Sequence, residues 1–360
     1  MIKARSGSDG KLSGGDQRRS VATIHDVARA AGVSIGTASQ ALNGRGKMRP
    51  ETRERIREAA ARLEYRPNAL MTSLLRGRSY TVSLISTDSY GRFSIPLLEG
   101  IEDTLGAARM SVFLCDARDD PARERWHIES LLAKQVDGII VTGRRTDQRK
   151  PIDIGNASVP VLYAYAQVAD PHALCIIPDD TQGARLAAEH LLQHGRRRLT
   201  HITGPRHFAA VRARQEGMRE ALADHELTLP DQRVCEGPWR ESWGYQAAAD
   251  LLAADPRIDA VFCGADLLAR GALDALRERG VRVPDDVAVA SFDNWEILAA
   301  GARPPLTTVD MNLHDLGRQA GAHLLAMIDG AAEHGVHRLP CSLVVRASCG
   351  AHPSDGHRAS

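Results

Sequence analysis

The side chains that could perform catalysis are scattered along this 360-residue chain and form no recognisable catalytic motif. The six cysteines show no C-x-x-C spacing, and most stand in apolar runs, which favours reduced, packed thiols over disulfides or a zinc site. The 14 histidines are spread out, and His194 and His201 fit solvated or packed positions better than catalytic ones. G-x-S-x-G, H-E-x-x-H, a Walker loop and a G-x-G-x-x-G after a strand are all missing. We therefore expect no enzyme activity, no metal site and no cofactor.

Charge is the second chemical signal, because it is divided unevenly along the chain. Residues 1–79 contain 16 Lys and Arg against 7 Asp and Glu, a net charge of +9, whereas the whole chain carries +1. A basic head on an acidic body indicates that the head meets a polyanion, although such asymmetry also arises by chance in a charged chain. The polar first 20 residues do not fit a signal peptide, and no apolar run approaches the length of a membrane span. We expect a cytoplasmic, nucleoid-associated protein without membrane contact.

Residues 21–64 carry the helical periodicity that would position the basic head. Thr23 and Asp26 have capping-box spacing, Gly32 ends a first short helix, and Ser34 can cap a second. A third helix is predicted over Pro50–Leu63. Two short helices joined by a glycine turn favour a helix-turn-helix, and a small helical packing module is the alternative.

From about Tyr80 the pattern changes to short apolar runs that alternate with amphipathic segments. The predicted strands are 81–86, 111–117, 136–143, 159–165, 199–204, 260–266 and 287–293, and the predicted helices include Leu97–Ala108, Ala122–Lys134, Gly183–Gln193 and Leu267–Arg279. Continuous Val/Ile/Leu runs between helices are typical of parallel sheets covered on both faces. We predict an α/β fold of two doubly wound parallel-sheet lobes behind the all-α head, with a ligand in the cleft between the lobes.

The head contains a long series of residues at fixed spacing: Thr23-Ile24, Asp26-Val27-Ala28, Ala31-Gly32-Val33-Ser34, Thr37, Ser39, Leu42-Asn43, Pro50-Glu51-Thr52-Arg53 and Tyr65-Arg66-Pro67-Asn68-Ala69. In these residues it closely resembles the LacI/GalR family of transcription regulators. Segments such as VDGIIVTG and VPDDVAVASFDN extend this resemblance to about residue 349. The resemblance implies a disordered basic arm (1–20), a headpiece (21–67), a hinge helix and linker (68–79), a periplasmic-binding-protein-like sensor (80–349) and a polar tail (350–360). The sensor's first lobe is expected over about 80–193 plus 310–340, and its second over about 196–308 plus 341–349.

By this resemblance, the second helix enters the major groove of DNA. Ile35, Gly36 and Gln40 are the implied base-reading residues, with Gln40 suited to adenine and Ile35 to a thymine methyl. Phosphate contacts are implied for Thr23, Ser34, Thr37, Ser39, Asn43 and Arg49, although Ser34 serves equally well as a helix cap. In the hinge, Leu74 aligns with a minor-groove wedge beside Asn68 and Ala69, and a plain linker is the alternative.

The resemblance also implies an effector site built from Phe93, Arg214, Trp239, Asp266 and Asp293. The alternatives are an ion pair for Arg214 and Asp293, ordinary packing for the two aromatic residues, and a helix cap for Asp266. Ala265, Met311 and the segment Tyr90-Gly91-Arg92 depart from the family pattern. They leave fewer polar partners and an added positive charge, so a sugar, a less polar ligand and an anionic ligand all remain open.

The expected function is that of a homodimeric repressor on a pseudo-palindromic operator in double-stranded DNA. A small-molecule effector, with a sugar as one candidate, is expected to change operator affinity. The alternatives are a corepressor-dependent regulator or activator of the same family, and a cytosolic solute-binding module. The polar tail lacks a heptad repeat, which favours a dimer over a tetramer.

Overall fold

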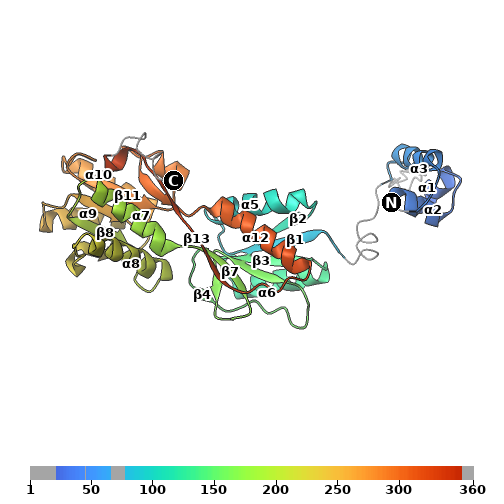
Figure 1. Ribbon diagram of the computed structural model, residues 1–360, viewed down its shortest axis with the longest axis horizontal. Helices are drawn as coiled ribbons and strands as arrows, with labels where there is room; N and C mark the ends of the chain where they lie inside the picture. Colours follow the sequence, from blue (N-terminus) through green and yellow to red (C-terminus); the bar gives the residue numbers. More distant parts are fainter. Residues whose placement is uncertain (1–21, 45, 66–77, 351–360) are drawn as a thin grey trace, which may run out of the picture. The chain divides into compact units, whose positions relative to one another are not determined.

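The computed structural model describes residues 22–44, 46–65 and 78–350 and divides the chain into two compact units, residues 1–79 and 80–360 (Figure 1). Each unit has its own hydrophobic core. The predicted basic arm and the predicted hinge residues Asn68, Ala69 and Leu74 lie outside the described residues.

The described residues of the first unit form three helices, α1 (Ile24–Ala30), α2 (Ile35–Leu42) and α3 (Pro50–Arg62), which confirms the predicted helical head. The amide and hydroxyl of Thr23 donate to the Asp26 carboxylate at 2.9 and 2.7 Å, so the predicted capping pair forms. Gly32 turns the chain toward α2 at a φ of +62°, a conformation that strains residues with a Cβ. The core is made mainly of small side chains, which let the helices cross closely: Val27, Ala28, Ala31, Ala38, Ala41, Ile56, Ala59 and Ala60.

The first lobe of the second unit is a parallel sheet of order β13-β7-β5-β3-β1-β2. Its strands are β1 (Thr81–Ser86), β2 (Ser111–Asp116), β3 (Gly138–Thr142), β5 (Val161–Ala164), β7 (Leu174–Pro178) and β13 (Gly335–Leu339). Helices α5 (Ser94–Ala107) and α12 (Leu313–Ile328) pack together on one face, and α6 (Pro121–Ala133) covers the other (Figure 1). A Cβ on Gly100 would lie 1.9 Å from the His314 carbonyl oxygen, so glycine allows the α5–α12 contact.

The second lobe repeats this plan with the strand order β14-β12-β11-β10-β8-β9. Its strands are β8 (Leu199–Thr203), β9 (Val234–Glu236), β10 (Ala260–Cys263), β11 (Ala288–Phe292), β12 (Thr307–Asp310) and β14 (Ser342–Val344), of which β14 alone pairs antiparallel in this sheet. Its helices are α7 (Asp180–Gln193), α8 (Ala209–Asp224), α9 (Glu241–Ala254), α10 (Asp266–Glu278) and α11 (Glu296–Ala299). Short strands β4 (Gln148–Arg149) and β6 (Gln167–Val168) pair separately.

The lobe boundary differs from the sequence expectation at α7. The expected first lobe extends to residue 193, whereas α7 packs on α8 and on the sheet of the second lobe. Gly183 is the physical reason, because its Cβ position lies about 3 Å from side chains of Phe292, Val309 and Cys341, which form that lobe's core. The chain therefore first crosses between the lobes directly after β7. Figure 1 shows the later return, with α12 beside α5 although they are far apart in sequence.

Among the helices that the structure describes, none is long and apolar enough to cross a membrane.

Candidate functional site

The residues predicted to read bases lie together at the start of α2 and one turn beyond it. Ile35 is 43% exposed, which is unusual for a large apolar side chain and fits a surface that awaits a partner. A Cβ on Gly36 would meet only the Ser34 hydroxyl at 3.9 Å, so the backbone there is open to close approach. Gln40 is exposed and lies beside Gly46. The helix thus presents an apolar group, a bare backbone and an amide on one accessible stretch.

The predicted phosphate-contact residues have local structural roles as well. The Ser34 hydroxyl accepts from the Thr37 backbone amide at 3.1 Å and caps α2. The side-chain amide of Asn43 donates to the Ser39 carbonyl at 2.9 Å. Arg49 is the residue before α3, and its side chain makes no capping bond. The local bonds order the ends of α2 and hold these polar groups at the rim of the base-reading stretch.

A cavity of about 470 Å³ lies between the two lobes of the second unit. Four of the five predicted effector residues line it: Phe93 from the first lobe, and Arg214, Trp239 and Asp293 from the second. Sequence reasoning missed further aromatic walls, which are Tyr165, Phe208 and Trp295, and treated Tyr90 and Arg92 only as departures. The Phe93 and Tyr165 rings stack at 4.9 Å between centroids. The cavity therefore combines several aromatic faces with a few charged groups.

Arg214 is the buried electrostatic centre of this cavity. Its Nε and Nη2 lie 2.8 and 2.7 Å from Asp180 Oδ1, and its Nη1 donates to the Gly264 carbonyl at 2.5 Å. Nη1 is also 3.7 Å from Asp293 Oδ1, and the guanidinium carbon lies 3.6 Å from the Phe292 ring centroid. Asp180 follows β7, a strand that sequence reasoning did not identify, so this partner was missed. Because these contacts fix the Arg214 guanidinium, its N–H groups can donate to a ligand without a change in side-chain conformation.

Asp293 pairs with two arginines from different lobes, Arg214 and Arg92. It follows β11 at a φ of +110°, a backbone conformation that side chains with a Cβ rarely adopt. Such strain at the carboxyl end of a strand is typical of functional positions.

Asp266 does not line the cavity, contrary to its assignment to the effector site. Helix α10 begins at Asp266 itself, with Ala265 as its N-cap residue, so the alternative of Asp266 as a helix cap is wrong as well. The carboxylate is fully buried and accepts from Ser291 Oγ at 2.5 Å, Thr308 Oγ1 at 2.7 Å and the Trp295 amide at 2.7 Å. Burial and the nearby Asp293 charge raise the pKa of Asp266 to about 7. Asp266 supports the loop that carries Asp293 and Trp295.

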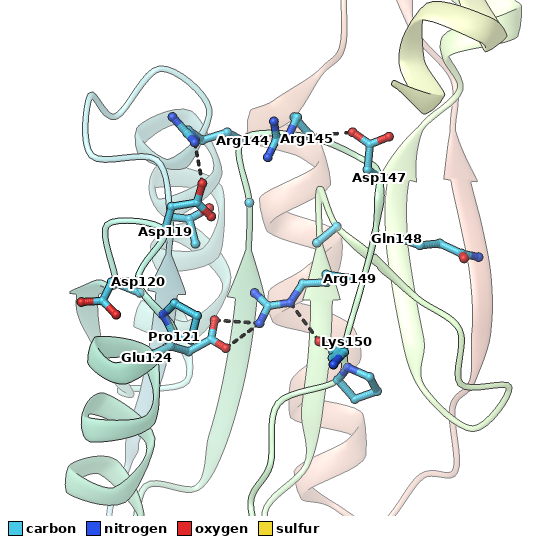
Figure 2. A pocket seen from close by; sticks show the side chains of 15 residues that line it. Asp119, Asp120, Pro121, Glu124, Arg144, Arg145, Asp147, Gln148, Arg149 and Lys150 are labelled. Carbon is cyan, nitrogen blue, oxygen red and sulfur yellow. Dashed lines mark hydrogen bonds and ion pairs between the residues drawn. The ribbon is translucent and has the colours of Figure 1, made fainter. Parts of the chain in front are cut away.

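A second cavity of about 370 Å³ lies in the first lobe (Figure 2). It shares Arg144, Arg145 and Asp147 with the cavity between the lobes. Figure 2 shows Arg144 directed at Asp119 and Arg149 directed at Glu124. The nitrogen–oxygen distances of these two ion pairs are 2.7 and 2.6 Å. Each arginine that lines this second cavity is paired with a carboxylate. Its charges are thus compensated internally, and the cavity between the lobes remains the better candidate site.

Comparison with known proteins matches both units. The profile described as bacterial regulatory proteins, lacI family, matches residues 23–68, and that of a periplasmic binding protein-like domain matches residues 188–349. Catabolite control protein A of Staphylococcus epidermidis is 33% identical over 82% of this chain and 89% of its own length. The HTH-type transcriptional repressor PurR of Haemophilus influenzae is 30% identical over 91% of this chain and 98% of its own.

Solved structures of similar fold cover almost the whole chain. The lac repressor dimer bound to operator and the anti-inducer ONPF has a TM-score of 0.77 at 27% identity, covering 92% of this chain and 100% of that one. The complex of the transcriptional regulator CelR with cellobiose has a TM-score of 0.64 at 30% identity, covering 91% and 99%.

Proposed function

Because this chain belongs to the lacI family of bacterial regulatory proteins, it is a DNA-binding transcription regulator, and we propose that it is a homodimeric repressor controlled by an effector in the cavity between its lobes. Operator DNA is bound by the headpiece, with Ile35, Gly36 and Gln40 on base edges. The phosphate-contact residues are Thr23, Ser34, Thr37, Ser39, Asn43 and Arg49, and the hinge contributes Asn68, Ala69 and Leu74 in the minor groove. The protein acts in the cytoplasm, on the nucleoid.

One observation carries the effector proposal: Phe93, Arg214, Trp239 and Asp293, which are distant in sequence, converge on one cavity of ligand size. The aromatic faces can stack on the apolar C–H face of a sugar, while Arg214 donates to its oxygens and Asp293 accepts from its hydroxyls. We infer a sugar or related metabolite as the effector. The CelR structure with cellobiose, a disaccharide complex of similar fold, supports this class.

Control of DNA binding requires that the effector bind two arrangements of the protein with different affinity. We infer that it changes the arrangement of the lobes and thereby the pairing of the two hinge segments on the operator. Operator fragments selected from the source genome would be titrated with purified protein, with and without candidate sugars. A lowered affinity identifies an inducer and a raised affinity a corepressor. Purely sequence-independent binding that no compound alters would contradict the proposal.

Gln40 provides a direct test of the base-reading surface. The substitution Gln40→Ala removes the amide that can pair bidentately with adenine, so discrimination at one base pair of the operator should fall by about 1–3 kcal/mol. Arg49→Ala is the matched contrast, because loss of a phosphate contact weakens binding to all sequences. It also lowers the slope of log binding constant against log salt concentration by about one in magnitude. Titration of operator and single-base variants at several salt concentrations separates the two effects. Equal loss on every sequence for Gln40→Ala would remove it from the base-reading set.

The dimer contact is assigned to the β2 edge of the first lobe. Phe113 and Leu114 are 44% and 45% exposed, and consecutive strand residues point to opposite faces of the sheet. Parallel strands are normally covered on both faces, so an edge uncovered on both sides favours a partner surface. A cavity of about 320 Å³ between β2 and α6, lined by these residues and His127, adds a place for a partner side chain. A second copy of this chain is the proposed occupant.

The substitution Phe113→Ala should raise the dimer dissociation constant roughly tenfold, because truncated apolar contacts at an interface cost about 1–2 kcal/mol. Val336→Ala is the matched control. Val336 is 45% exposed on β13, the opposite edge of the same sheet. Sedimentation equilibrium of both variants measures the effect. A dimer weakened by Val336→Ala and not by Phe113→Ala would move the interface to the other edge.

A further inference from the structure

Arg92 bridges the lobes within the candidate effector cavity. It lies in the loop between β1 and α5 of the first lobe, and its Nη2 pairs with the Asp293 carboxylate of the second lobe. The Arg92 side chain is 19% exposed and that of Asp293 only 5%, so the pair is largely withdrawn from water. The Nε of Arg92 is buried without a hydrogen-bond partner among the described residues. An unmet donor costs free energy, so Arg92 is held less firmly than the fully bonded Arg214.

Two aromatic rings, one from each lobe, enclose the Arg92 guanidinium. Its central carbon lies 4.8 Å from the Phe93 ring centroid and 4.9 Å from that of Trp295. Both distances fall within the range of cation–π attraction. The planar guanidinium therefore occupies a slot whose walls are aromatic and whose floor is the Asp293 carboxylate. A flat ligand with hydrogen-bond donors would fit the same three groups.

Asp293 is the carboxylate at which a ligand would have to compete with a side chain from the opposite lobe. Asp88 is engaged by the backbone amides of Phe93 and Ser94, at 2.7 and 3.0 Å. Asp147 accepts from the Ala209 amide at 2.7 Å. Backbone donors are fixed by the fold, whereas the long Arg92 side chain can rotate away toward solvent.

We propose that Arg92 is a specificity-determining residue whose guanidinium occupies the slot into which the effector must insert. This inference rests on the proposed function of the same cavity. An effector then has to offer donors to Asp293 and a flat face to Phe93 and Trp295 in order to displace the guanidinium. Because the effector can bind only after Arg92 has left the slot, the apparent affinity equals the intrinsic affinity multiplied by the fraction of molecules in which Arg92 has left. Small flexible polyols without a flat face are thereby rejected.

The slot itself is tested with methylguanidinium, a free counterpart of the Arg92 head group, on the full-length protein. In Arg92→Ala, methylguanidinium chloride should bind with a dissociation constant on the order of millimolar, seen as a change in tryptophan fluorescence relative to equal sodium chloride. Wild type, Arg92→Met and the double variant Arg92→Ala/Asp293→Asn should not respond. Arg92→Met keeps the slot filled and checks that the loop folds. An Arg92→Ala protein that binds methylguanidinium no better than wild type overturns the proposal.

Displacement by a ligand is tested with cellobiose and D-glucose on wild type and Arg92→Ala. A sugar that binds wild type should bind Arg92→Ala roughly tenfold more tightly, because the competing occupant is gone. Weaker binding to Arg92→Ala would make Arg92 a ligand contact and overturn the inference. If neither sugar binds either protein, the sugar class proposed above fails, while the methylguanidinium titration still decides whether the slot exists.

Discussion

Arg214→Ala is expected to destabilise the sensor unit by about 3–5 kcal/mol, the cost of removing one partner from a buried charge network. Arg214 is 3% exposed, and its loss leaves Asp180 and Asp293 facing the same space without their shared counter-charge. The Gly264 carbonyl also loses its donor. Urea denaturation followed by circular dichroism measures the change, and the sugar response of operator binding should disappear even where the variant remains folded.

Arg219→Ala is the matched control for that substitution, since it removes an arginine from the same helix. Arg219 pairs with Asp231 at 3.1 Å, but the two side chains are 44% and 92% exposed. Exposed pairs contribute between about 0 and 1 kcal/mol, so this variant should unfold close to wild type. The free energy of unfolding of Arg214→Lys should lie between those of the two alanine variants, because lysine keeps the charge and loses the planar set of guanidinium donors. A loss below about 1 kcal/mol for Arg214→Ala would mean that water reaches the two carboxylates.

Elements that the sequence predicted well are those with strong periodicity. The apolar run 81–86 became β1, and the run 136–143 became β3, because their Val, Ile and Leu residues are buried inside the sheet. The headpiece was equally readable, since Thr23, Gly32 and Ser34 mark helix ends through local chemistry. Among the strands that were missed, β9 and β13 are short or half-exposed and carry little pattern, whereas β7 is a fully buried apolar strand that was overlooked.

The candidate site was predictable only where a residue could be aligned with the family motif. Phe93, Arg214, Trp239 and Asp293 line the cavity, but the pairing of Asp180 with Arg214 depends on how α7 packs on α8. The pairing of Arg92 with Asp293 depends on how the lobes meet. No local pattern encodes a contact between residues about 200 positions apart, as for Arg92 and Asp293. The assignment of Asp266 to the effector site was wrong for a related reason. A carboxylate at the end of a strand looks the same in sequence whether it faces the cavity or the core.

Asp266 should make the sensor unit less stable as the pH rises from 5 to 7. Its folded-state pKa is about 7, raised first by burial and then by the Asp293 charge, against an ordinary value of 3.8. Between these values the unfolded chain releases the proton and the folded chain keeps it. The free energy of unfolding therefore falls with pH, by about 2–3 kcal/mol over this interval, and levels off above pH 7.

Asp266→Asn isolates this contribution from the histidines that titrate in the same range. The hydroxyl of Ser291 lies 3.4 Å from the Thr307 carbonyl and can donate there, which leaves it free to accept from the new amide. The asparagine oxygen can still accept from the Trp295 amide, as the carboxylate does at 2.7 Å. The variant should thus be close to wild type in stability at pH 5 and more stable at pH 8.

The decisive quantity is the free energy of unfolding of Asp266→Asn minus that of wild type, measured by urea titration at each pH. Effects common to both proteins cancel in this difference. A difference that grows from pH 5 to pH 7 and then stays constant assigns the proton to Asp266. A difference that does not change with pH would mean that the three hydrogen bonds to its carboxylate hold the charged form against burial. In that case Asp266 supports the loop of Asp293 and Trp295 as an anion at every physiological pH, and the cavity beside it has the same shape throughout.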